Sequence, residues 1–323
     1  MKPLHHVAKI LLLNIILLIM IVAHAAAEEL PLTVSPELAA LVKEGLENNQ
    51  QLRSQHSRVK ALKAEIPTAG AWDDPMFGVA LLNVPTDTYS FNQEPMTQKQ
   101  ISLGQKFPWF GKLDLKTQYA VLEAKKAEAK WTMQQLALAK QIISSYYELA
   151  FIGRSQAINQ ELMDKLNQLL QVSESRYAGG KGLQTDVLQS QVELSRLREE
   201  QIDLANNRQM AERRLNELLN RPEFQTIPPA AAPAVPEWVM NDQQVGQRAL
   251  THNPELLLRH LAVDQAAVGV EMTHKSYYPD FDVRVAYGFR EPASNGMERA
   301  DFLSAGINLN IPIWQGQKQN PRL

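Results

Sequence analysis

Residues 281–289 read FDVRVAYGF, so large apolar side chains alternate with polar or small ones. A period of two is typical of a strand with one apolar face. The same period runs through residues 302–313, FLSAGINLNIPI, and through the shorter stretches FGVAL at 77–81 and ISLG at 101–104. The sequence therefore predicts four amphipathic strands of about 9–12 residues, the length of strands in outer membranes.

The strands belong to a module that occurs twice. An offset of 204 residues, without a gap, aligns Phe77 with Phe281 and Pro108 with Pro312. The same offset aligns further pairs: Leu46 with Leu250, Asn49 with Asn253, Leu52 with Leu256, His56 with His260, Pro75 with Pro279, Val79 with Val283, and Leu103 with Ile307. After Pro108 the first copy continues through more than a hundred helix-patterned residues, whereas 11 residues follow Pro312.

Long helical patterns flank the strands. Ser35-Pro36 predicts a helix start with Pro at its first position. Apolar spacing predicts helices over residues 36–67, 113–176, 183–220 and 241–275, the last interrupted and capped at Asn253. At about 1.5 Å per residue, the helix over 113–176 would extend for about 96 Å, which suits an aqueous gap such as a periplasm.

The N-terminus has the pattern of an export signal. Lys2 and Lys9 precede an apolar run at 10–23, and small residues suitable for cleavage end at Ala27. The run is shorter than the 20 or so residues of a membrane span, although a retained anchor is the alternative to cleavage. The chain is then organised as a signal peptide (1–27), a first repeat (28–221), a proline-rich linker (222–240) and a second repeat (241–323).

Composition excludes several classes of function. The net charge of −2 gives no basic field for nucleic acid. The chain has no cysteine, so disulfides and thiolate chemistry are absent. His56 and His260 lack the i, i+4 partner of a helical metal site, which favours a structural or surface role. With no nucleophile–base pattern either, we expect no enzyme, no metal and no cofactor.

Amphipathic strands occur both in soluble sheets and in outer membranes. The export signal and the aromatic residues near the strand ends favour the membrane, with Trp109, Phe110 and Trp314 as candidate interface aromatics. Asp282 and Arg284 are candidate lumen-facing residues, with a pairing role as the alternative. Residues 84–98 and 290–300 would be outer loops. Four strands cannot close a barrel, so several copies are needed, and three would supply twelve strands.

Three motifs resemble those of the TolC-type outer membrane efflux channels. They are the strand exits QKFPWFGK (105–112) and NIPIWQG (310–316) and the hairpin RYAGGKGLQTDVL (176–188). Together with Asp74-Pro75-Met76, the segment 107–112 is most similar to the heavy-metal cation branch of that family. The resemblance covers nearly all of the mature chain.

The resemblance implies a mixed α and β fold. Four strands per protomer would join a trimeric β-barrel in the outer membrane, and long coiled-coil helical hairpins would form a periplasmic α-barrel. It also implies that the hairpin tips dock on a periplasmic adaptor, which joins an inner-membrane RND pump.

The predicted tip contains the candidate docking residues. Gly179, Gly180 and Gly182 would shape the turn, and Thr185 and Asp186 would take part in gating or docking. An N-cap role at a helix that starts near residue 183 is the alternative for Thr185 and Asp186.

The chain departs from the family pattern because a second long hairpin is expected after Gln317-Lys318. We therefore expect a C-terminally truncated or frameshifted member, or a fragment. The function indicated is a passive exit duct in a Gram-negative outer membrane, for heavy-metal cations. The alternatives are a duct for drugs or type I secretion substrates, and a periplasmic coiled-coil adaptor or scaffold.

Overall fold

The structure is a computed structural model that describes residues 35–223, 225, 227 and 241–322. The predicted signal peptide and most of the predicted linker lie outside the described residues. The described residues separate into two compact units: those at 35–49 combine with those at 138–244, and those at 50–137 combine with those at 245–322. One long helix, α4 (Lys112–Ala178), contributes its second half to the first unit and its first half to the second unit.

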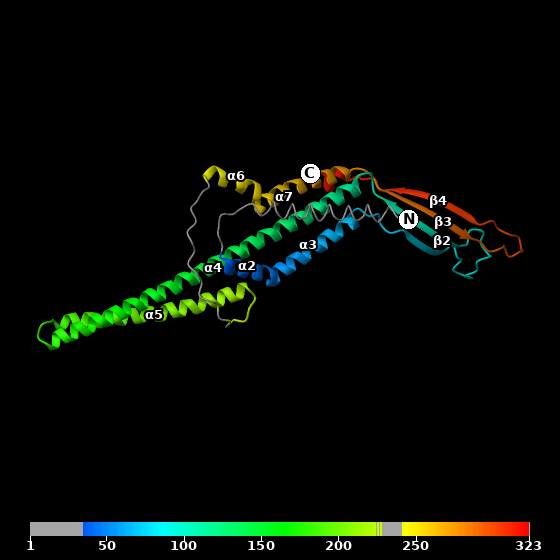
Figure 1. Cartoon of the computed structure of the whole chain (residues 1–323). Helices are drawn as coiled ribbons and strands as arrows, with labels where there is room; N and C mark the ends of the chain where they lie inside the picture. The colour runs from blue at the N-terminus through cyan, green and yellow to red at the C-terminus, as the bar shows by residue number, and fades with distance from the viewer. Residues whose placement is uncertain (1–34, 224, 226, 228–240, 323) are drawn as a thin grey trace, which may run out of the picture. The chain divides into compact units, whose positions relative to one another are not determined.

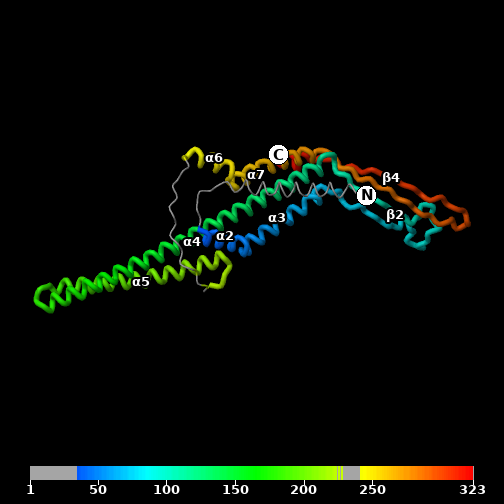
Figure 2. The backbone as a smooth tube through the Cα atoms, viewed as in Figure 1, coloured from blue at the N-terminus to red at the C-terminus, as the bar shows by residue number. Residues whose placement is uncertain are grey.

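The first unit is helical. It contains α2 (Pro36–Asn48), the second half of α4, and α5 (Gln184–Leu218), which runs antiparallel to α4 (Figure 2). The side chain of Ser35 caps α2 as predicted, because its Oγ accepts a hydrogen bond from the amide of Leu38 at 3.3 Å. The largest fully buried apolar side chains of this unit are Leu38, Ile142, Leu215, Leu219 and Ile227.

Two close contacts hold α2 in the first unit. The guanidinium of Arg221 donates two hydrogen bonds to the carboxylate of Glu44, at 2.6 and 2.5 Å. One turn of α2 also approaches α4 at Gly45, where an added Cβ would lie 2.4 Å from Cδ1 of Ile142. The hydrogen bond from Arg221 lowers the pKa of the Glu44 carboxyl, and burial opposes this only in part.

The end of α5 differs from the prediction. The sequence predicted a helix to residue 220, ended by Pro222, but α5 ends at Leu218. Asn220 takes a left-handed conformation with φ of 54°, and the amide of Arg221 donates to the carbonyl of Asn216 at 2.9 Å. These contacts form a Schellman motif, which ends the helix before the chain reaches Pro222.

The second unit carries the sheet on three helical segments: α3 (Gln50–Ala69), the first half of α4, and α7 (Pro254–Lys275), which follows α6 (Asp242–His252). On one side of α4, His56 of α3 stacks on Trp131 with ring centroids 4.8 Å apart. On another side, Gln265 of α7 bonds Glu123 at 2.8 Å and Lys126 at 2.6 Å. Figure 1 shows α4 between α3 and α7.

The predicted helix over 36–67 is two helices, α2 and α3. Asn49 separates them because its backbone is extended, with φ of −67° and ψ of 117°. Asn253 separates α6 from α7 in the same way, and its side chain caps α7 through the amide of Glu255 at 2.9 Å, as predicted. Pro67 does not end α3, since it lies in the last turn and the helix continues to Ala69.

The four strands form one antiparallel sheet in the order β1-β2-β3-β4 (Figure 1). The strands are β1 (Met76–Leu82), β2 (Gln98–Phe107), β3 (Phe281–Phe289) and β4 (Phe302–Leu309). Each repeat contributes one hairpin, and the two hairpins join where β2 pairs with β3, with Phe107 opposite Phe281.

Two strands are shorter than the predicted 9–12 residues. β1 has 7 residues because Asn83 turns the backbone to a φ of 51°, and β4 has 8. Ile311 and Ile313, which were predicted within the last strand, lie beyond its end. In their segment Pro312 has no amide hydrogen for a ladder bond.

Candidate functional site

One face of the sheet is apolar and open to the surroundings. Strand register places alternate residues of all four strands on this face, and most of its large apolar side chains are exposed. Phe77 and Val79 are each 70% exposed, and Leu303 is 75% exposed. A contiguous apolar surface of this kind marks an interaction site. Its exposed apolar members are Phe77, Val79, Leu81, Ile101, Leu103, Val285, Tyr287, Phe289, Leu303, Ile307 and Leu309.

The opposite face carries mainly small and polar side chains. Asp282 lies on it between Lys106 of β2 and Asn308 of β4, and Arg284 lies between two glycines. Both candidate lumen residues thus share the polar face.

The predicted outer loops contact each other. They occupy residues 83–97 and 290–301, close to the predicted bounds. Arg290 donates to the carbonyl of Pro95 at 3.1 Å, and Arg299 donates to the carbonyl of Glu94 at 3.0 Å. The two hairpins are therefore joined at their loops as well as along β2 and β3.

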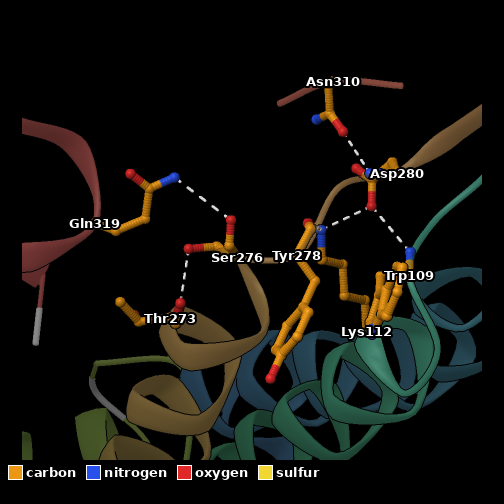
Figure 3. Close-up of polar contacts among 8 residues, drawn as sticks. All are labelled: Trp109, Lys112, Thr273, Ser276, Tyr278, Asp280, Asn310 and Gln319. Carbon is orange, nitrogen blue, oxygen red and sulfur yellow. Dashed lines mark hydrogen bonds and ion pairs between the residues drawn. The ribbon is translucent and has the colours of Figure 1, made fainter. Parts of the chain in front are cut away.

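The other end of the sheet is held by Asp280, which immediately precedes β3 (Figure 3). Its Oδ1 accepts hydrogen bonds from Nζ of Lys112 at 2.7 Å and from the amide of Trp109 at 2.9 Å. Its own amide donates to Oδ1 of Asn310, just beyond β4. Lys112 also donates to the carbonyl of Tyr278 at 2.8 Å. Sequence reasoning missed this cluster.

The cluster is largely shielded from water, since the side chains of Lys112 and Asp280 are 16% and 18% exposed. Burial is the largest single effect on the Asp280 carboxyl and raises its pKa. The hydrogen bonds from Lys112 and Trp109, with the positive charge of Lys112, outweigh burial, so the net pKa lies below its usual value. Asp280 is therefore negatively charged at neutral pH.

Aromatic side chains gather beside this cluster. Trp109 stacks on Tyr278 and Phe281 with centroid distances of 5.2 and 5.5 Å, and Phe110 lies 5.9 Å from Trp109. Phe110 is 79% exposed, and Trp314, beyond β4, is 65% exposed. A depression of 520 Å³ opens here, lined by apolar side chains that include Trp72, Phe107, Trp109, Phe110, Phe281 and Ile307.

The turn between α4 and α5 closes through glycine. Gly180 has a φ of 73°, and the amide of Lys181 donates to the carbonyl of Arg176 at 2.8 Å. This is a Schellman closure, which favours glycine because a Cβ is strained at positive φ. At Gly182 a Cβ would lie 3.2 Å from the amide nitrogen of Tyr177, so the chain approaches itself closely. Gly179 also lies in this turn.

The capping alternative for Thr185 and Asp186 is wrong. The helix α5 begins at Gln184, so both residues are already helical, and Leu183 occupies the N-cap position without a side-chain bond. Both side chains are exposed. Asp186 lies in the first turn, where its negative charge interacts favourably with the helix dipole.

Two further findings concern the described residues as a set. None of the helices within 35–223 and 241–322 combines the length and the apolar character of a membrane span. In the same part of the chain, no group of three His, Cys, Asp or Glu side chains is arranged to hold a metal ion.

The chain thus combines a sheet that has one apolar and one polar face with a long helical hairpin. The family model described as outer membrane efflux protein matches residues 41–221, more than half of the chain. The chain belongs to this outer membrane efflux protein family. Membership confirms the predicted outer-membrane localisation, and it confirms that the chain is not an enzyme.

Individual relatives are distant. The chain is 18% identical over 312 residues to the putative multidrug resistance outer membrane protein MdtQ of Shigella flexneri, covering 89% of this chain and 64% of that relative. It is 27% identical over 152 residues to the alkaline protease secretion protein AprF of Pseudomonas aeruginosa, covering 45% and 31%. This chain thus spans less than two thirds of the length of either relative.

The fold is shared with solved structures. The outer membrane protein VceC of Vibrio cholerae superposes with a TM-score of 0.67 at 19% identity, covering 88% of this chain and 70% of that one. The predicted fold class, strands joined to a long helical hairpin, is confirmed.

Proposed function

We propose that this chain is the outer-membrane channel component of a tripartite efflux system. One observation carries the proposal: a chain of the outer membrane efflux protein family has a four-stranded sheet whose apolar face is largely exposed. Lipid would contact that face, because burying apolar surface away from water is favourable. The polar face, with Asp282 and Arg284, would line the water-filled lumen and tune permeation.

The channel is a homotrimer in this proposal. Four strands per copy are too few to close, and three copies supply twelve. Residues 1–27 would direct export. The aromatic residues Trp109, Phe110 and Trp314 would lie at the membrane–water interface, where such rings are enriched.

The turn between α4 and α5 is the proposed docking site for a periplasmic adaptor. Its exposed surface includes Thr185 and Asp186, and the Schellman closure at Gly180 holds the backbone in one shape. The adaptor would join an inner-membrane RND pump, which supplies the energy. The chain itself would be a passive duct.

Heavy-metal cations are the proposed cargo, on the strength of Asp74-Pro75-Met76 and the strand exit at 107–112. Drugs are the second candidate, because the relative MdtQ is named for multidrug resistance. Secretion substrates are a third, supported by the partial likeness to AprF.

Fractionation and complementation test the proposal. We expect the full chain in outer membranes as a heat-modifiable trimer on gel electrophoresis. In a strain without its own efflux channels, the chain together with its adaptor and pump should raise the tolerated concentration of metal cations more than that of drugs. A monomer in the soluble periplasmic fraction would instead identify the chain as a scaffold and overturn the proposal.

A further inference from the structure

The depression of 520 Å³ beside Trp109 lies at one end of the apolar face, the end away from the two loops. Its lining includes three side chains of that face, namely Phe281 and Val283 of β3 and Ile307 of β4. Trp72 and Trp109 line it from the segments that connect strands to helices. Its volume is within the range of about 300–1,000 Å³ that is typical of sites for small ligands. The depression therefore has the size and the apolar lining of a binding site.

Two opposite charges border this depression. Asp114, in the first turn of α4, lines it and is exposed. Gly111 also lines it, and a Cβ built at Gly111 would lie 3.8 Å from Nζ of Lys275. The ammonium of Lys275 lies over the ring of Tyr278 at 5.8 Å, and an ammonium has three N–H groups to offer to oxygen acceptors. An apolar hollow is thus bordered by one carboxylate and one ammonium.

We infer that the depression binds one phospholipid molecule of the phosphatidylethanolamine type, whose head group carries a phosphate and a primary ammonium. The inference rests on the proposed function, which places the apolar face in lipid. An acyl chain would fill the hollow, since an unfilled void gives up van der Waals contacts of its lining atoms. The phosphate would accept hydrogen bonds from Lys275, and the ammonium would lie against Asp114. A purely anionic head group matches Lys275 but is repelled by Asp114.

The position of the depression favours a lipid over a soluble ligand. Its lining runs from the apolar face of the strands to the start of α4, where the chain leaves the sheet. Tryptophan side chains such as Trp72 and Trp109 are enriched at the boundary between membrane and water. Asp114 and Lys275 both lie at helix ends, beyond the strands. A lipid has the same order of parts, with its chain towards the sheet and its head group towards the helices.

Native mass spectrometry of the full chain, purified in detergent and titrated with dioleoylphosphatidylethanolamine, tests the site. We expect one saturable lipid per copy, bound about threefold more tightly than dioleoylphosphatidylglycerol, since an exposed charge pair contributes little. Asp114→Asn should abolish that preference. Lys275→Gln should weaken the binding of both lipids about fivefold. The control Lys60→Gln removes the same charge from an exposed lysine of α3 and should weaken neither.

Two further variants test the position of the acyl chain. Val283→Trp would place a ring in the depression and should weaken binding by at least about fivefold, because overpacking is unfavourable. The matched control Val285→Trp lies two residues along the same face, outside the depression, and should leave binding unchanged. Binding that does not saturate, or that is equal in all variants, would overturn the site. Equal binding of the two lipids would overturn the assignment of the head group.

The outcomes separate this inference from the proposed function. A trimer from outer membranes that binds no lipid in a saturable way would overturn the lipid site, and the proposed channel would survive. If that trimer dissociates with Val283→Trp but not with Val285→Trp, a neighbouring copy occupies the depression, which again overturns the lipid site alone. A wild-type chain recovered as a soluble periplasmic monomer would overturn the channel and the lipid site together.

Discussion

The carboxylate of Asp280 lies 2.7 Å from the ammonium of Lys112, and this ion pair joins the two repeats of the chain. Lys112 begins the long helix of the first repeat, and Asp280 precedes the first strand of the second. Because Asp280 also bonds the amide of Trp109 and Asn310, one side chain and its backbone fix the ends of three strands. The pair is thus the link between helix and sheet in the second unit.

Asp280→Asn should destabilise the second unit. The substitution leaves the mostly buried ammonium of Lys112 without its negative partner. Loss of a hydrogen bond between charged groups costs about 1.5–3 kcal/mol. Urea unfolding in detergent, followed by tryptophan fluorescence, measures the change. The control Asp282→Asn, two residues along the strand, should change the free energy of unfolding by less than about 0.5 kcal/mol. Equal effects of the two variants would show that the cluster contributes no special stability.

The first unit should lose stability in acid through Glu44. Its carboxyl has a lowered pKa in the folded state, so the folded state binds fewer protons than the unfolded state at mildly acid pH. The contribution is complete above the unfolded pKa of about 4.3 and is lost as the pH falls through the lower folded value.

Two variants isolate this contribution. Glu44→Gln should be less stable than the natural chain at pH 7, and the difference in the free energy of unfolding should shrink below about pH 4. Arg221→Gln should show the same loss of pH dependence, because it removes the group that lowers the pKa. Unfolding curves across this pH range give the comparison. A difference that stays constant down to strongly acid pH would contradict the assignment to Glu44.

The sequence predicted the sheet well because each strand carries its own evidence. A period of two in β3 and in its copy β1 assigns both faces without any knowledge of the partners.

The break between α2 and α3 at Asn49 could also have been predicted from the sequence. Its equivalent, Asn253, was recognised by the proline that follows, and the offset of 204 residues transfers that break to the first repeat. The prediction of one helix over 36–67 missed this break because each helix was predicted separately, without comparing the two repeats.

The cluster at Asp280 could not be read from local patterns. Lys112 and Asp280 are 168 residues apart in sequence, and they meet only because β2 and β3 are neighbours. The duplication gives no hint, since the equivalent of Asp280 is Met76. The predicted N-cap of α5 was wrong for a related reason. Thr185 and Asp186 are both residue types that favour the N-cap position, but the turn at Gly180 makes α5 begin before them, so neither residue occupies that position.

Substitution by alanine should destabilise the chain at Gly45 and stabilise it at Gly269. Gly45→Ala places a Cβ against the buried Ile142, and overpacking costs about 1–3 kcal/mol, more than the helix propensity of alanine returns. Gly269→Ala in α7 meets nothing within 4 Å and should stabilise by about 0.5–1 kcal/mol. The denaturant midpoints of the two variants, compared with that of the natural chain, show whether each substitution raises or lowers stability. Adding Ile142→Val, which removes the contacting methyl, should restore much of the loss at Gly45, and a failure to do so would place the cost elsewhere.

The two faces of the sheet should differ in their access to water. Arg284 and Val285 are adjacent but lie on the polar and apolar faces. In proteoliposomes of the full chain, Arg284→Cys should react with a charged, membrane-impermeant thiol reagent about tenfold or more faster than Val285→Cys. A thiol against lipid has a raised pKa, and each unit of increase lowers the thiolate fraction about tenfold.

Ser102→Cys and Ile101→Cys form the matched pair on β2, where register puts Ser102 on the polar face and Ile101 on the apolar face. Denaturation in detergent should make all four cysteines react at similar rates, which checks that the labels themselves behave alike. Equal rates within each pair in intact proteoliposomes would mean that water reaches both faces. The apolar face would then need a protein partner instead of lipid, because a contiguous apolar surface is unfavourable in water.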